Sequence, residues 1–231
     1  MFKPTLLSAT FAAITTLSLF ANPVAAAEPL KLQVYNPGEK SLFPVSSELI
    51  SGATEAVLID AQFQANDAQA LVEMIKASGK RLTSIYISHS DPDSYFGLDV
   101  LHAAFPQAKI VASAPTIAAI KANKDAKLAY WGPILKTNAP KALLVPELLQ
   151  GNQLSVDGQP LEVQGLHGVA SAHSYVWIPS LKAVVGGVLV YGNMHLWTAD
   201  AQTPLARADW QQSLQQIQAL KIQHPDKHVM M

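Results

Sequence analysis

ISHSDPDSYFGL, residues 87–98, is the stretch that most narrows the fold and chemistry of this chain. His89, Asp91 and Asp93 place one imidazole and two carboxylates within five residues. A donor set of this kind can hold a hard or borderline divalent cation. The alternative interpretation is a helix start, in which Asp91 or Asp93 caps free N–H groups beside Pro92.

The pattern around this stretch indicates a layered α/β fold. An apolar strand pattern precedes it and a helical pattern follows it, so the stretch is predicted to form a loop at the carboxyl end of a buried strand. A helix over residues 66–78 is predicted to begin at Asn66 or Asp67 and to end at Gly79. The other elements expected in this half are strands at 30–35, 56–59, 82–87 and 109–112 and a helix at 95–105.

The second half of the chain is richer in short strand patterns. Asp157 and Gly158 form a strong hairpin signal between two of these strands. The expected elements are strands at 142–145, 153–156, 161–164, 175–178 and 183–190, followed by an amphipathic helix at 204–220. No internal repeat and no linker-like stretch interrupts the pattern, so we expect a single domain.

The N-terminal residues are typical of a secretory signal peptide. Lys3 precedes an apolar stretch at 6–21, and small residues follow, so cleavage is expected after Ala26 or Ala27. The apolar stretch is short and contains Thr and Ser, which disfavours a permanent membrane span. We therefore expect a signal peptide over 1–26, a mature domain over 27–231, and a periplasmic or secreted location.

Composition excludes several classes of protein. The chain has 231 residues, of which 49% are hydrophobic and 14% charged, which is typical of a globular protein and not of a disordered one. Sixteen Lys and Arg against seventeen Asp and Glu leave a net charge of -1, so we expect no nucleic-acid partner. The chain has no cysteine, so any metal site must use His, Asp or Glu.

The stretch at 87–98 resembles the metal-binding motif of the metallo-β-lactamase fold family, which is written H-x-H-x-D-H and is usually followed by x-x-G. His89 stands at the first His, Asp93 at the Asp and Gly97 at the Gly. Asp91 occupies the place of the second His, and Ser94 that of the final His. The resemblance implies an αββα sandwich, that is, two sheets packed face to face with helices on both outer sides.

The resemblance continues along most of the mature chain. Residues 161–167 resemble the strand that leads to the family's next His ligand, a role for which His167 and His173 compete. Val188 stands where the family places a bridging Asp. The chain ends before the family's last strand and its Pro-Gly-His ligand, so that strand is expected to be missing or altered. Tyr95, His195 and Trp197 are the residues expected to line the pocket.

These departures favour a centre with one metal ion over a dinuclear centre. The expected ligands are His89, Asp91, Asp93 and either His167 or His173, holding one Zn²⁺, with Mn²⁺ or Fe²⁺ as alternatives. Asp91 or Asp93, whichever stays free, would orient the nucleophile. The resemblance thus implies an exported, metal-dependent hydrolase of a small molecule with an ester, thioester, phosphoester or amide bond. The alternative is a catalytically inactive protein that binds a ligand or partner on the same fold.

Overall fold

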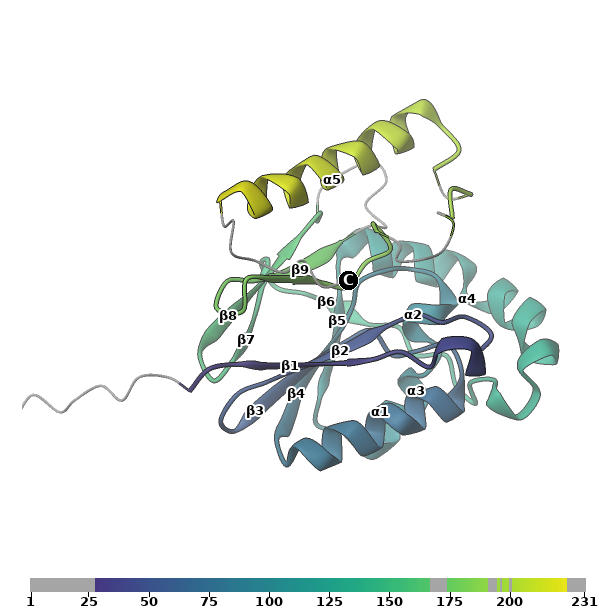
Figure 1. Ribbon diagram of the computed structural model, residues 1–231. Coiled ribbons are helices and arrows are strands. Elements are labelled where there is room, and N and C mark those ends of the chain that lie inside the picture. The colour runs from purple at the N-terminus through teal and green to yellow at the C-terminus, as the bar shows by residue number, and fades with distance from the viewer. Residues whose placement is uncertain (1–27, 167–173, 191–194, 196, 200, 224–231) are drawn as a thin grey trace, which may run out of the picture.

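The computed structural model describes residues 28–166, 174–190, 195, 197–199 and 201–223, and it contains two β-sheets (Figure 1). The first sheet has six strands in the order β1-β2-β3-β4-β5-β6, which are Lys31–Tyr35, Ser47–Ser51, Glu55–Ile59, Arg81–Ile87, Lys109–Ala112 and Glu147–Leu148. The second has four strands in the order β10-β9-β8-β7, which span Ala183–Val185, Tyr175–Ile178, Gln159–Gln164 and Gln153–Val156.

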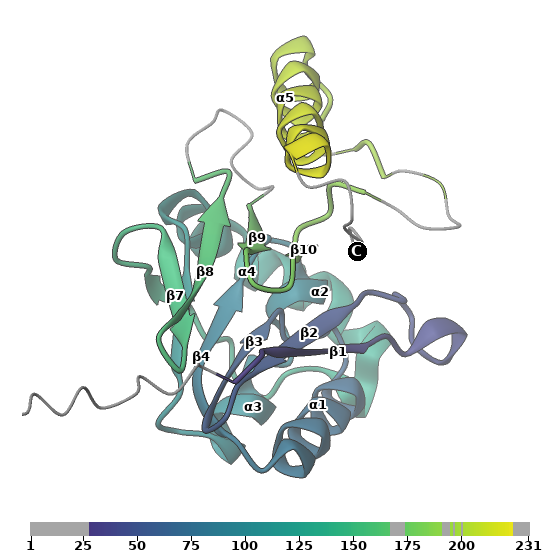
Figure 2. The ribbon, with the colours of Figure 1, turned by 60° about the vertical axis from the view of Figure 1, so that its left-hand side comes forward.

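Helices cover the outer sides of the two sheets. In Figures 1 and 2, α1 and α3 lie against the first sheet, whereas α5 lies beyond the second. The described helices are α1 (Ala65–Ser78), α2 (Pro92–Tyr95), α3 (Leu98–Ala104), α4 (Ala114–Leu135) and α5 (Pro204–Gln223), with 3-10 turns at Gly38–Lys40 and Lys136–Asn138. The αββα sandwich implied by the resemblance is therefore confirmed.

Three apolar layers hold the sandwich together. Leu58 and Ile85 of the first sheet pack with Leu71 of α1 in the outer layer. The middle layer lies between the two sheets and contains Ile59 and Val163. The third layer lies under α5 and contains Trp177, Trp210 and Ile217. Because β3 has an apolar layer on both faces, its residues 56–59 are all apolar and buried.

Strands β3, β4 and β5 run parallel, so their carboxyl ends meet at one edge of the first sheet. The segment that follows β4 at this edge carries His89, and Asp60 follows the neighbouring strand β3. Parallel strands of this type present side chains for function from the loops at their carboxyl ends. The predicted position of the 87–98 stretch, after a buried strand, is confirmed.

Several predicted elements are confirmed within one or two residues. The helix expected at 66–78 is α1, and it ends at Gly79, whose φ of 66° is the left-handed conformation of a C-cap. Asn66 and Asp67 lie inside its first turn, since the N-cap residue is Gln64. Asp157 and Gly158 connect β7 and β8 with φ angles of 48° and 77°, which fits a type I′ turn.

Three predicted elements differ from the structure. The helix expected at 95–105 is the shorter α3, Leu98–Ala104, and a separate short helix, α2, forms at Pro92–Tyr95, where a loop was expected. Residues 142–145 form no strand, because their apolar side chains pack on the core as irregular chain ahead of β6. The strand expected at 183–190 ends at Val185, since Gly186 and Gly187 both have positive φ angles, near 73° and 75°.

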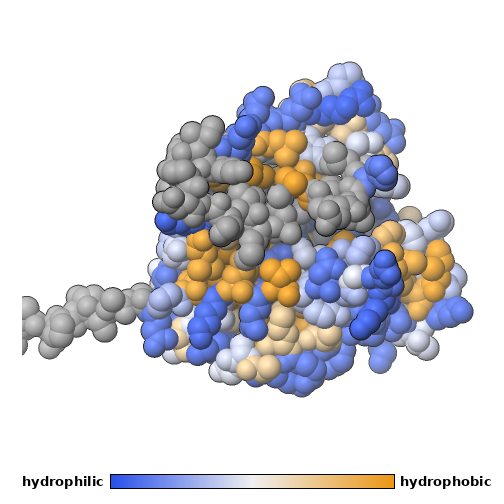
Figure 3. All heavy atoms as spheres, viewed as in Figure 1, coloured by the Kyte–Doolittle hydropathy of each residue, from blue (hydrophilic) through white to orange (hydrophobic). Residues whose placement is uncertain are grey.

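Helix α4 and strand β2 were not expected from the sequence. Helix α4 spans 22 residues and contains Pro133. Its outer end exposes Tyr130 by 65% and Ile134 by 47%, and apolar side chains gather there in Figure 3. Within the described part of the chain, no helix is both long and apolar enough to cross a membrane.

Candidate metal centre

The loop between β4 and α2 is fixed at both ends by local structure. Ile87 is fully buried at the end of β4, and Pro92 begins α2 at the position where its fixed φ and missing N–H are tolerated. Asp91 is the N-cap residue of α2, but its side chain makes no capping hydrogen bond. The helix-start interpretation therefore explains the backbone of this residue and not the direction of its carboxylate.

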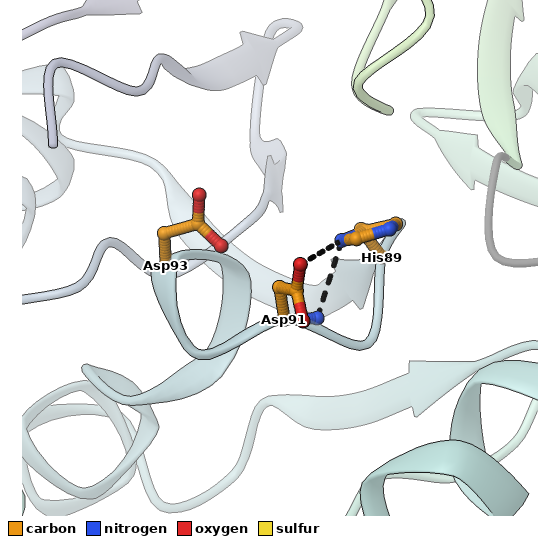
Figure 4. A group of neighbouring side chains, drawn as sticks. All are labelled: His89, Asp91 and Asp93. Carbon is orange, nitrogen blue, oxygen red and sulfur yellow. Dashed lines mark hydrogen bonds and ion pairs between the residues drawn. The ribbon is translucent and has the colours of Figure 1, made fainter. Parts of the chain in front are cut away.

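His89, Asp91 and Asp93 converge on one point beside the loop (Figure 4). One ligand atom from each lies within 4.8 Å of the others. His89 is only 2% exposed, and its Nδ1 accepts a hydrogen bond from the backbone N–H of Asp91 at 3.2 Å. The same nitrogen is 3.9 Å from Asp91 Oδ2.

The chemistry of this donor set fits a divalent ion. Ligand atoms bound to one zinc ion at about 2.1 Å each are separated by about 3.5 Å, so the cluster needs only a small contraction to hold one. One nitrogen and two carboxylate oxygens suit Zn²⁺, Mn²⁺ or Fe²⁺. His167 and His173, the candidates for a further ligand, lie outside the described residues.

A lysine from α4 also reaches the cluster. Lys127 Nζ donates to Asp91 Oδ1 at 2.7 Å, and the two residues are 36 positions apart in the sequence. Lys127 is not among the residues predicted for the site, because the sequence pattern does not reveal the helix that carries it. Only the position of that helix in three dimensions places its ammonium group beside the loop.

Asp60 anchors the residue before His89. Its carboxylate accepts hydrogen bonds from the backbone N–H of Ser88 at 2.8 Å and from the Ser88 hydroxyl at 2.5 Å. The Ser88 oxygen in turn accepts a hydrogen bond from the N–H of Gly187 at 2.7 Å. The loop is therefore tied to β3 and to the segment after β10 through one serine.

A second set of hydrogen bonds ties the same serine to the second sheet. The hydroxyl of Ser174, just before β9, donates to the Ser88 carbonyl at 2.6 Å and accepts from the Tyr86 hydroxyl at 2.8 Å. All three residues are fully buried. Buried networks whose members are all satisfied make the local geometry rigid, so the position of His89 is determined by both sheets.

Two buried carboxyl groups lie under the loop. Burial raises the pKa of Asp60 to about 8, although hydrogen bonds from Ser88 oppose the rise and the charges of Glu48 and Asp93 add to it. Burial likewise raises the pKa of Glu48, in β2, to about 7. Glu48 Oε2 has no hydrogen-bond partner in the part of the chain that the structure describes. Both groups therefore keep their proton to a higher pH in the folded state than an exposed carboxyl group does.

The sequence profile of the metallo-beta-lactamase superfamily matches residues 41–229, which include the loop and every described strand except β1. The chain belongs to the metallo-beta-lactamase superfamily. Members of this superfamily bind divalent metals, typically zinc. A search of the curated proteins gives no match.

Solved structures support the same fold. The DIM-1 metallo-beta-lactamase exposed to ceftazidime aligns with a TM-score of 0.58 and 21% identity, covering 84% of this chain and 83% of its own. A metallo-beta-lactamase from Pontibacter korlensis aligns with a TM-score of 0.60 and 19% identity, and the alignment covers 90% of this chain and 86% of the other. A metallo-beta-lactamase family protein from Thermus thermophilus aligns with a TM-score of 0.59 and 17% identity, and the alignment covers 83% of this chain and 70% of the other. At these identities the likeness concerns the fold.

Ser94 and Val188, which the resemblance places at ligand positions of the family, carry no strong ligand group. Ser94 is buried, its N–H donates to the Asp91 carbonyl at 3.0 Å, and its carbonyl accepts from the N–H of Ala61 at 2.7 Å. Val188 directly follows Gly187, which contacts the loop through Ser88. The backbone thus contacts the loop at Ser94 and at Gly187, the residue before Val188.

The three residues expected to line a pocket lie in different environments. Tyr95 is 1% exposed and packs edge-on against Phe96 in the core, and its hydroxyl has no hydrogen-bond partner among the described residues. His195 and Trp197 are exposed, Trp197 by 60%, and neither forms a hydrogen bond or an ion pair within the described residues.

A surface hollow lies between α1, α3 and the segment at 137–141. Its volume is about 600 Å³, and none of the candidate metal ligands lines it. Lys76, Asp99 and Lys141 are the charged residues at its wall. The hollow and the metal cluster are therefore separate features of the chain.

Proposed function

We propose that this chain is a metal-dependent hydrolase with one divalent ion held by His89, Asp91 and Asp93. The observation that carries the proposal is the convergence of these three side chains, with one ligand atom of each within 4.8 Å of the others, in the stretch at 87–98 that resembles the superfamily motif. Zinc is the proposed ion, with Mn²⁺ or Fe²⁺ as alternatives, and His167 or His173 is the proposed further ligand.

A divalent ion supplies Lewis acidity, which lowers the pKa of water toward neutrality and polarises a carbonyl or phosphoryl oxygen. The chain supplies the positioning. Ser88 and its partners hold His89, while Lys127 holds one oxygen of Asp91 and leaves the other facing His89. An oxygen of Asp91 or Asp93 that does not bind the ion would accept a hydrogen bond from the attacking water and orient it.

A single ion is proposed because ligands for a second one are lacking. Ser94 stands where the motif has its final His, and its backbone serves α2 and the loop after β3. Val188 has no carboxylate with which to bridge two ions. Small molecules with ester, thioester, phosphoester or amide bonds are the proposed substrates, because the fold alone does not select among them.

We also propose that the chain is exported. The support is the sequence pattern of residues 1–26, in which Lys3, an apolar stretch and small residues follow one another. The mature protein would then be one domain over 27–231 in the periplasm or outside the cell.

A catalytically inactive binding protein is the second candidate. The observation that favours it is the ion pair between Lys127 and Asp91, since a carboxylate already paired with an ammonium group is a weaker metal ligand. Such a protein would keep its ligand when the metal is removed.

Hydrolysis of a substrate panel after metal removal tests the proposed activity. The protein is stripped with a chelator, refilled with Zn²⁺, Mn²⁺ or Fe²⁺, and assayed on esters, thioesters, phosphoesters and amides. We expect turnover of at least one class that needs metal and that falls by about 100-fold or more in His89→Ala, because the buried ligand is lost. His102→Ala, an exposed histidine on α3, is the matched control and should retain activity. Equal turnover by the stripped protein would contradict the proposal.

A further inference from the structure

The ion pair between Lys127 and Asp91 is part of the candidate centre and not a freely solvated surface pair. The side chains are 37% and 27% exposed, and the Nζ to Oδ1 distance is 2.7 Å. Partial burial weakens screening by water, so the lysine charge acts strongly on its neighbours.

The two oxygens of Asp91 face different nitrogen atoms. Oδ1 accepts the hydrogen bond from Lys127, whereas Oδ2 lies 3.9 Å from His89 Nδ1. The residue also belongs to the cluster whose ligand atoms lie within 4.8 Å of one another. A carboxylate can accept on both oxygens, so the ammonium group and a metal ion can bind it at the same time. Both are attracted by the same single negative charge.

The aspartate at position 91 makes this arrangement possible. The superfamily motif has a histidine there, and a ligating imidazole is neutral and carries an N–H donor on its other nitrogen, which cannot accept from an ammonium group. An aspartate adds a negative charge and a second acceptor, and Lys127 uses both. Asp91 and Lys127 therefore form a matched pair at the site.

We propose that Lys127 is a fixed competitor of the metal at Asp91, which weakens binding of the ion and disfavours a second one. The inference rests on the metal site of the proposed function. With neutral His89, the carboxylates of Asp91 and Asp93 give a charge of -2, and Lys127 reduces it to -1. A divalent ion is attracted less to the smaller charge and is repelled by the ammonium group itself.

Zinc affinity of the Lys127→Met variant tests the inference without any activity assay. The full chain is stripped of metal, and the Kd for Zn²⁺ is measured by competition with a chromophoric chelator at one pH and salt concentration. We expect Lys127→Met to bind Zn²⁺ about tenfold more tightly than the wild type, which corresponds to about 1.4 kcal/mol. Lys127→Arg keeps the charge and should bind as the wild type does.

Lys124→Met is the matched control for the loss of one positive charge from α4. Lys124 Nζ lies 2.7 Å from Asp125 Oδ1, so the variant also breaks an ion pair of the same length, but Asp125 is not in the cluster. Its Kd should equal that of the wild type. If Lys127→Met does not fold, as judged by circular dichroism, Lys127→Gln replaces it.

The possible results separate the inference from the proposed function. An unchanged Kd in Lys127→Met overturns the competition and leaves the metal site standing. Weaker binding also overturns it, because Lys127 would then help by orienting Asp91. If neither the wild type nor any lysine variant binds Zn²⁺, the metal site and the inference both fail.

Discussion

Replacing Gly97 with alanine is expected to destabilise the protein by about 3 kcal/mol or more, because the new methyl group has no space. A Cβ at this position would lie 2.1 Å from the carbonyl oxygen of Ala61 and 2.6 Å from the Cβ of Ala68. The N–H of Gly97 also donates to the Gln62 carbonyl at 3.0 Å, so the two segments cannot separate without losing this bond. The free energy of unfolding in urea measures the effect.

Gly132→Ala is the control for this prediction. Gly132 lies inside α4, and a Cβ there would meet only a side-chain methyl of Leu128 at 3.7 Å. Alanine should therefore stabilise the helix by about 0.5–1 kcal/mol. If the two variants unfold at the same urea concentration, the close approach of Gly97 to the loop after β3 is not a determinant of the fold.

Stability of the metal-free protein is expected to fall by about 3 kcal/mol or more as the pH rises from about 5 to about 9. Burial raises the pKa of Glu48 from 4.5 to about 7 and that of Asp60 from 3.8 to about 8. Between the unfolded and folded values, the folded state holds protons that the unfolded state has released. This contribution is therefore complete below about pH 4 and is lost as the pH passes 7 and 8.

The Glu48→Gln variant separates the contribution of one carboxyl group. Glutamine has a similar shape and stays neutral, so the stability of the variant should change less with pH, and it should exceed that of the wild type near pH 8. Glu73→Gln, at an exposed position of α1, should leave the profile unchanged. Urea unfolding with chelator present gives the profile, and a wild-type stability that rises over this range would contradict the argument.

Strong local patterns made much of the framework predictable. The apolar run at 56–59 in β3 and the helical spacing before Gly79 are independent of distant contacts, and the structure confirms both. The turn at Asp157 and Gly158 follows from backbone chemistry that few residues satisfy. The motif at 87–98 also placed His89, Asp91 and Asp93 on one loop, where the structure brings them together.

Elements that depend on tertiary contacts could not be predicted in this way. Strand β2 contains Ser47 and Glu48, which look like solvent-facing residues in the sequence but are buried between other layers. Helix α4 has no clear apolar stripe, so hydrophobic periodicity does not reveal it. The position of Lys127 beside the loop could therefore not be predicted either. The hydrogen bonds that Ser88 makes to segments 28 and 99 positions away are likewise absent from any local pattern.

The metal content of the folded protein tests the central proposal most directly. The wild type, stripped and refilled with Zn²⁺ and then dialysed, should retain about one equivalent per chain by elemental analysis. His89→Ala should retain none, and His102→Ala should retain as much as the wild type. A folded wild type that keeps no metal, or a His89→Ala variant that keeps as much as the wild type, would contradict a centre built on His89, Asp91 and Asp93.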